Sequence, residues 1–165
     1  MVENFRLINL KMENTYTPMF HEILDMVHKV KTKSDKVRVL SQYNSDGLRW
    51  VLRSGLDPAV KWLLPQGKPP FIANDAPDGT EHTRLAREYR TLDNYISVNG
   101  VPAKPDLNQN RRETLFIQLL EGLSVGEAEL IIACKDRNLA KIYKGMSVNV
   151  AKEAFRWDDN FMLIK

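Results

Sequence analysis

The sequence predicts an all-α fold, a compact multi-helix domain, from three observations. The chain has 165 residues, the size of one ordinary domain, which is enough to bury a core without disulfide or metal staples. Its hydrophobic content of 43% with 27% charged residues is typical of globular proteins. Helix-starting residues recur along the chain ahead of apolar residues at helical spacing. We therefore expect one helical domain over residues 1–165.

The first third of the chain contains four predicted helices. "TPMFHEILDMVHKVK" offers Thr17 as N-cap and Pro18 at the first helical position, followed by apolar residues on one face. "SDKVRVLSQY" begins after a Ser34 cap, and "DGLRWVLRSG" begins after an Asp46 cap. "LDPAVKWLL" repeats an Asp-Pro start and predicts a fourth helix. The turns between them are short, which indicates a compact helical cluster.

Two loops separate the remaining predicted helices. Residues 65–80 hold four prolines and two glycines, a composition that excludes regular helix and central strand. "EHTRLAREYRTLDNYI" then predicts one helix, with Leu85 on its apolar side. Residues 97–110 form the second loop, where the Asn-Gly pair at 99 and 100 favours a tight turn and a short hairpin.

The last third is again helical. "RRETLFIQLLEGL" predicts one helix, and Ser124 opens the next with Glu127 three residues later, the spacing of a capping box. We expect Cys134, within an apolar run, to be a buried thiol rather than a reactive one. Ser147 starts a final helix, after which residues 156–165 form a short apolar tail.

Positive charge is concentrated in two segments. The net charge is +3 and the pI is near 9, which permits a polyanionic partner without requiring one. The two segments could flank a single phosphate track, or they could be two ordinary solvated surfaces, and composition favours neither. The first holds Lys29, Lys31, Lys33, Lys36 and Arg38, and the second holds Lys135, Arg137, Lys141 and Lys144.

The sequence predicts no catalytic residues, no metal site and no cofactor. His21 and His28 lie two turns apart on one predicted helix, too far along its axis to share a tetrahedral zinc ion without distant ligands. "NSDGLR" at Asn44–Arg49 has every defining position of the adenylating motif Lys-x-Asp-Gly-x-Arg except the lysine. An asparagine amide cannot attack phosphorus, so we interpret this stretch as a helix-starting turn. An enzyme is the least favoured function.

The N-terminal helical DNA-binding domain of phage-type ATP-dependent DNA ligases resembles two stretches of this chain. They are "HEILDMVHKVKTKSDKVRVLSQYNSDGLRWVLRSGLDPAVKWLLPQGKPP" and "LLEGLSVGEAELIIACKDRNLAKIYKGMSVNVAKEAF". The second stretch is the more specific, because its residues follow the domain's closing pattern in order. The matching positions are Lys36, Leu40, Leu48, Val51, Leu52, Asp57, Pro58 and Pro65 in the first, and Leu123, Ser124, Glu127, Ala128, Glu129, Leu130, Lys135, Asp136, Leu139, Gly145 and Phe155 in the second.

The resemblance implies a ligase-like DNA-binding domain that stands alone, without the adenylating and OB-fold domains. The whole chain is also similar to a group of proteins from large tailed phages, including cyanophages. The implied function is a non-catalytic phage protein that grips duplex DNA through phosphate and minor-groove contacts with little sequence preference, in DNA replication, repair or packaging. The DNA-binding residues would be Lys33, Lys36, Arg38, Lys135, Arg137, Lys141 and Lys144.

A second class of function is a protein-interaction module or virion component on the same scaffold. The tail resembles the short apolar C-terminal peptides with which phage factors dock on a sliding clamp, and a tail folded onto its own core is the alternative. The partner-binding residues would be Trp157, Phe161, Met162 and Leu163. No apolar run is long enough to span a membrane, and the N-terminal segment does not predict a signal peptide. We expect the cytoplasm of the infected bacterial host, with virion association left open.

Overall fold

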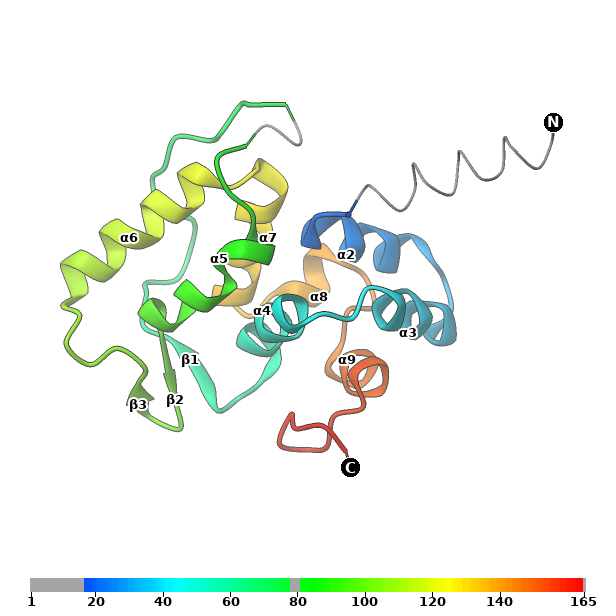
Figure 1. Cartoon of the computed structure of the whole chain (residues 1–165). Coiled ribbons are helices and arrows are strands. Elements are labelled where there is room, and N and C mark those ends of the chain that lie inside the picture. Colours follow the sequence, from blue (N-terminus) through cyan, green and yellow to red (C-terminus); the bar gives the residue numbers. More distant parts are fainter. Residues whose placement is uncertain (1–16, 78–80, 165) are drawn as a thin grey trace.

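Helices form most of the structure, which confirms the helical class, and a small antiparallel sheet is added to them (Figure 1). The structure is a computed structural model that describes residues 17–77 and 81–164. The prediction about a signal peptide, the end of the 65–80 loop and the last tail residue lie outside the described residues. No helix in the described part of the chain is long and apolar enough to cross a membrane.

The helices divide between the two ends of the sequence. The N-terminal group is α2 (Phe20–Lys29), α3 (Lys33–Gln42) and α4 (Asp46–Leu56). The C-terminal group is α6 (Gln109–Gly122), α7 (Val125–Lys135), α8 (Leu139–Ile142) and α9 (Val148–Phe155). The two groups interleave, because α3 packs on α9 and α4 packs on α7. The chain therefore closes on itself, with segments about 100 residues apart side by side (Figure 1).

The helix starts differ from the predicted ones by one or two residues. Thr32, not Ser34, caps α3, and its hydroxyl accepts a hydrogen bond from Asp35 N at 3.1 Å. Ser45, not Asp46, caps α4 by accepting from Leu48 N at 3.2 Å. In both cases the cap is the residue whose side chain reaches the free N–H group three positions later. Residue type alone does not distinguish this residue from its neighbours, because Thr, Ser and Asp all form N-caps.

Helix α2 also starts later in the sequence than predicted. Met19, not Thr17, occupies the N-cap position, so Pro18 lies before the helix rather than at its first position. The carboxylate of Glu22 accepts a hydrogen bond from Met19 N at 3.0 Å, as the third residue of a capping box does.

The prediction of a fourth helix after Asp57 was wrong, because the chain turns at this residue and continues as a strand. Asp57 Oδ1 accepts from Ala59 N at 2.9 Å, while Oδ2 accepts from Arg53 Nε at 2.9 Å. This side-chain turn competes with helix continuation and leads into β1 (Val60–Trp62). β1 pairs antiparallel with β2 (Ile96–Val98), and Val60 lies opposite Val98.

The Asn-Gly pair forms the expected hairpin between β2 and β3 (Val101–Pro102). Both turn residues have positive φ, 53° for Asn99 and 82° for Gly100, as a tight two-residue hairpin turn requires. The preceding segment is not one α-helix as predicted. It forms a single turn, α5 (Leu85–Glu88), followed by a 3-10 helix, η1 (Tyr89–Tyr95).

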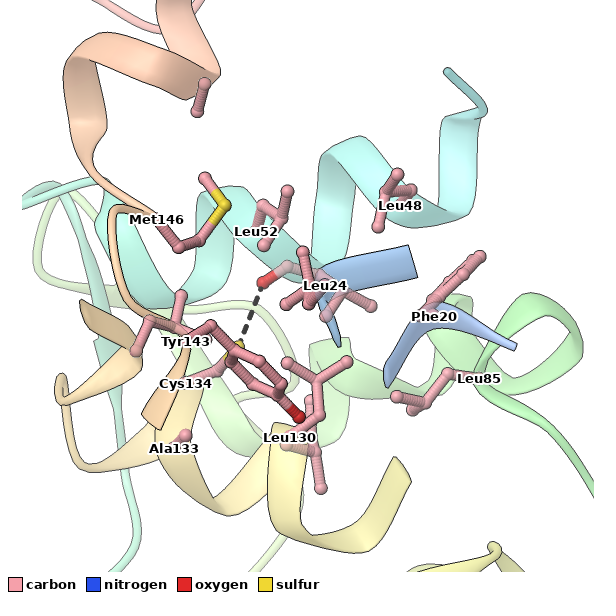
Figure 2. Packing of buried hydrophobic residues seen from close by; sticks show 14 of the residues in the cluster. Phe20, Leu24, Leu48, Leu52, Leu85, Leu130, Ala133, Cys134, Tyr143 and Met146 are labelled. Atoms are coloured by element: carbon pink, nitrogen blue, oxygen red, sulfur yellow. Dashed lines mark hydrogen bonds between the residues drawn. The ribbon is translucent and has the colours of Figure 1, made fainter. Parts of the chain in front are cut away.

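The hydrophobic core joins both helical groups at Cys134 (Figure 2). Its thiol is fully buried and donates a hydrogen bond to Val51 O at 3.4 Å, and burial raises the pKa of this thiol to about 12. The prediction that Cys134 is buried is confirmed. Leu24 of α2, Leu52 of α4 and Leu130 of α7 are fully buried members of the same core cluster (Figure 2).

The carboxylate of Glu127 is buried between the starts of two other helices. Its Oε2 atom accepts from Phe20 N, the first residue of α2, at 3.2 Å, and its Oε1 atom accepts from Leu85 N, the first residue of α5, at 2.9 Å. Ser124 caps α7 as predicted, accepting from Glu127 N at 3.3 Å. The glutamate side chain does not complete that capping box and instead spans to the other elements. Desolvation raises its pKa.

We predict that Glu127→Gln destabilises the protein by about 1–3 kcal/mol, because one of two buried N–H groups then faces an amide NH₂ group instead of an acceptor. The free energy of unfolding, from urea titrations, measures the effect. Glu129→Gln, at an exposed position on the same helix, is the matched control. Equal stability of the two variants would contradict a linking role for Glu127.

Candidate nucleic-acid interface

Lysines gather at the corner between α2 and α3. Lys29 ends α2, Lys31 lies in the connection and Lys33 begins α3, and all three side chains are exposed. Lys33 pairs with Glu153 at 3.2 Å. Lys29 and Lys31 make no ion pair with any residue that the structure describes. Within the first predicted basic segment, Lys29 and Lys31 thus present positive charge to solvent without an ion-pair partner among the described residues.

The second basic segment meets this corner through Lys144. The backbone N–H of Lys144 donates to His28 Nδ1 at 2.8 Å, and its carbonyl oxygen accepts from Lys36 Nζ at 3.1 Å. These two hydrogen bonds join segments more than 100 residues apart, and the Lys144 side chain is exposed beside them. We call the exposed residues Lys29, Lys31, Lys33 and Lys144 the basic surface. Lys141, also exposed, precedes Lys144 by three residues on α8.

Lys36 is not part of this surface, contrary to the prediction. It is 8% exposed, and its ammonium donates to Val27 O at 2.7 Å and Val30 O at 2.6 Å as well as to Lys144 O. All three of its donors are used by carbonyl oxygens, two of them at the carboxyl end of α2. The ammonium therefore caps the carboxyl end of α2 and has no free N–H donor for a phosphate.

Lys135 is likewise buried, at 4% exposure, and was wrongly placed on the surface. Its ammonium donates to Pro65 O at 2.7 Å, Gly67 O at 2.9 Å and Asp136 Oδ1 at 2.6 Å. Asp136 Oδ1 also accepts from Gly67 N at 3.1 Å. The pair therefore holds the proline-rich loop against the end of α7.

Two arginines of the predicted site lie in other surroundings. Arg38 is exposed on α3 and pairs with Asp35 at 3.4 Å. Arg137 follows α7 with a positive φ of 60°, and its backbone N–H donates to Cys134 O at 3.3 Å. Burial lowers the pKa of the Arg137 guanidinium, while the nearby carboxylate of Asp57 opposes the shift.

Two further cations lie near Lys33 and were missing from the sequence prediction. Lys152 and Arg156 lie four residues apart at the end of α9, which packs along α3. They stand outside both charge-rich segments, so local charge density gave no signal. Arg156 is the residue after α9 and has a positive φ of 54°, so the four-residue spacing from Lys152 does not place both side chains on one helical face. No sequence feature therefore indicated that the two cations lie together.

The C-terminal tail folds back onto the protein, so two of its predicted partner-binding residues are in the core. Trp157 is 7% exposed and Phe161 is 5% exposed, and their rings lie 5.5 Å apart. A backbone bridge between Trp157 and Leu163 closes the tail. Met162 and Leu163 remain exposed, at 55% and 64%.

The "NSDGLR" stretch is confirmed as a helix start. The side-chain oxygens of Asn44 and Asp46 both accept hydrogen bonds from Arg49, so the stretch folds on itself. Together with the tail it lines a hollow of about 460 Å³, and Phe155 and Trp157 also belong to the lining. The described residues contain no group of three or more His, Cys, Asp or Glu side chains that could hold a metal ion.

The protein is thus small and mostly helical, and it has an exposed lysine-rich corner. The chain belongs to DUF6433, a family of unknown function whose family model matches residues 23–141. This span includes α3, α4 and α7 and ends within α8, so Lys144 lies just beyond it. No curated protein and no solved structure matches the chain.

We predict that Lys36→Met lowers the free energy of unfolding by about 2–4 kcal/mol, because it leaves buried carbonyl oxygens without donors while keeping the length of the stem. Chemical denaturation measures the loss. Lys33→Met, at an exposed position on the same helix, should change stability by less than about 0.5 kcal/mol. A Lys36→Met protein as stable as the Lys33→Met protein would show that the ammonium group is not a structural element.

Proposed function

We propose that this protein is a non-catalytic DNA-binding protein that holds duplex DNA through its phosphates. The observation that supports this most directly is the convergence of the two basic segments, joined by the 2.8 Å hydrogen bond from Lys144 N to His28 Nδ1. Lysines of the basic surface come from α2, α3 and the α8–α9 connection. Convergence of charge from separate segments is what a phosphate track requires.

The type of side chain indicates the kind of contact. The lysines of the basic surface are flexible point charges, whereas base-specific contacts usually use the planar fork of arginine or the amides of asparagine and glutamine. Contacts made by these lysines would fix the position of the duplex without discriminating its sequence. The proposed binding is therefore sequence-tolerant and sensitive to salt.

The resemblance to the ligase DNA-binding domain and to tailed-phage proteins extends this proposal. In that setting the protein would act on phage DNA in the cytoplasm of the infected bacterium, during replication, repair or packaging, with virion association as a variant. Lys36 and Lys135, two of the matching positions, serve the interior here. A shared fold alone would explain why these two lysines match the ligase domain, just as a shared binding site would.

We predict that the protein binds a short duplex of arbitrary sequence at ~50 mM salt, and that the logarithm of the binding constant falls linearly with the logarithm of salt concentration. Fluorescence anisotropy with a labelled duplex measures both. Lys31→Ala and Lys144→Ala should each make the slope shallower by about 0.9, the amount for one phosphate contact.

Lys104→Ala is the matched control, because Lys104 is exposed in the segment after β3, at the other end of the molecule from α3 (Figure 1). Its slope should equal that of the unmodified protein. The proposal fails if no duplex binding is found at ~50 mM salt. It also fails if Lys104→Ala weakens binding as much as Lys31→Ala does.

A second candidate function, docking on a partner protein, is supported by the exposed end of the tail. Met162, Leu163 and Ile164 are 55%, 64% and 49% exposed, while the aromatic residues next to them anchor the tail. A fixed loop with adjacent exposed apolar side chains is a common form of protein-docking site. The tail resembles the short apolar C-terminal peptides with which phage factors dock on a sliding clamp, so a sliding clamp is the partner class that we propose.

We predict that Leu163→Ser abolishes binding to a purified phage sliding clamp, measured by anisotropy of the labelled protein, without changing duplex affinity. Ile72→Ser is the matched control, since Ile72 is an exposed isoleucine (79%) in the proline-rich loop and should have no effect on clamp binding. Equal clamp binding by the Leu163→Ser and unmodified proteins would exclude the tail as the docking element.

A further inference from the structure

A shallow hollow of about 420 Å³, wide open to solvent, lies where α3, α9 and the tail meet. Three cations and one acid line it: Lys33, Lys152, Arg156 and Glu153. Trp157 and Ile164 provide an apolar wall. Lys33 belongs to the basic surface as well, so the hollow continues that surface along α9. We call it the α9 cleft.

The backbone of the tail fixes Arg156 at the edge of this cleft. Arg156 follows α9 with a positive φ of 54°, and its N–H donates to Lys152 O. Its own carbonyl accepts from Ile164 N at 2.8 Å. The guanidinium is exposed and makes no ion pair with any described residue. The side chain is thus available while its backbone is constrained.

Lys152 is held beside Arg156 by weak, exchangeable contacts. Its ammonium lies 3.0 Å from Asp159, whose side chain is fully exposed, and 5.5 Å from the centre of the Phe161 ring. The pair between Lys33 and Glu153 is also solvent-exposed, with 59% of each side chain accessible. Exposed ion pairs contribute little to stability, so a stronger anion could displace either carboxylate at small cost.

We propose that the α9 cleft binds a phosphate group, and that this phosphate belongs to the backbone of bound nucleic acid. The assignment of the phosphate to nucleic acid rests on the proposed function. The cleft contains three cations against the single acid Glu153, whereas Asp159 lies outside its lining. A phosphate carries more acceptor oxygens than a carboxylate and accepts two hydrogen bonds from a guanidinium. Arg156 is therefore its main ligand, and Lys33 and Lys152 are supporting ligands.

The test compares Arg156→Asn and Lys152→Gln with Lys104→Ala in duplex titrations at several salt concentrations. Asparagine is tolerated at positive φ, so Arg156→Asn removes the charge while preserving the backbone. Each cleft variant should weaken duplex binding about eightfold at 0.1 M salt and make the salt slope shallower by about 0.9, as expected for one lost phosphate contact. Circular dichroism melts establish that the variants are folded.

Glu153→Gln provides a test in the opposite direction. It removes the one acid among the described residues that line the cleft and frees Lys33, so duplex binding should become tighter. A tighter Glu153→Gln protein together with weaker Arg156→Asn and Lys152→Gln proteins supports the cleft. A Glu153→Gln protein that binds more weakly than the unmodified protein overturns it.

A second arm measures inorganic pyrophosphate binding by phosphorus NMR line broadening, to identify the source of the phosphate. If Lys31→Ala weakens duplex binding but Arg156→Asn and Lys152→Gln do not, the cleft is overturned and the proposed function stands. If the unmodified protein binds pyrophosphate in an Arg156-dependent way but binds no duplex, the cleft takes a free phosphate group that is not part of nucleic acid, and the DNA proposal falls. If neither ligand binds, both proposals fall.

Discussion

The buried carboxylate of Glu127 is the interaction on which the arrangement of this protein depends. It accepts hydrogen bonds from the first residues of α2 and α5, which lie 107 and 42 residues away in sequence. A carboxylate without these two N–H groups would be too costly to bury, and two helix starts without it would have unsatisfied donors in the interior. The starts of α2 and α5 are therefore both held by one side chain of α7, and this side chain fixes where α2 begins.

At its other end, α2 is terminated by the buried ammonium of Lys36. A helix with a carboxylate at its N-terminus and an ammonium at its C-terminus has both charges in the favourable direction of its dipole. Because Lys36 also binds the carbonyl of Lys144, the same amine sets the distance between α2 and the α8–α9 connection. The exposed lysines of the basic surface are thus positioned from the inside of the protein, by a charge that is only 8% exposed.

The sequence revealed local features better than these long-range ones. The Asn-Gly hairpin, the Ser124 cap and the buried cysteine each follow from a few neighbouring residues, and each is present. The spacing of Ser124 and Glu127 predicted a capping box, but nothing local indicates that the glutamate bonds to Phe20 and Leu85 instead. Lys36 and Lys135 sit within charged runs that are otherwise exposed, so their burial depends on carbonyl groups supplied by distant segments. The prediction of a helix after Asp57 failed for a related reason, because the strand that forms there needs β2, almost 40 residues later, as a partner.

Lys135 has a role that in many secreted proteins belongs to a disulfide bond. Its amine, together with Asp136, ties a loop without regular structure to the end of α7 through Pro65 and Gly67, roughly 70 residues earlier in the chain. The chain has one cysteine and cannot form an internal disulfide. Such a cross-link made of hydrogen bonds does not depend on redox conditions, reforms whenever the chain refolds, and needs no second specialised residue in the loop, because any backbone carbonyl can accept it.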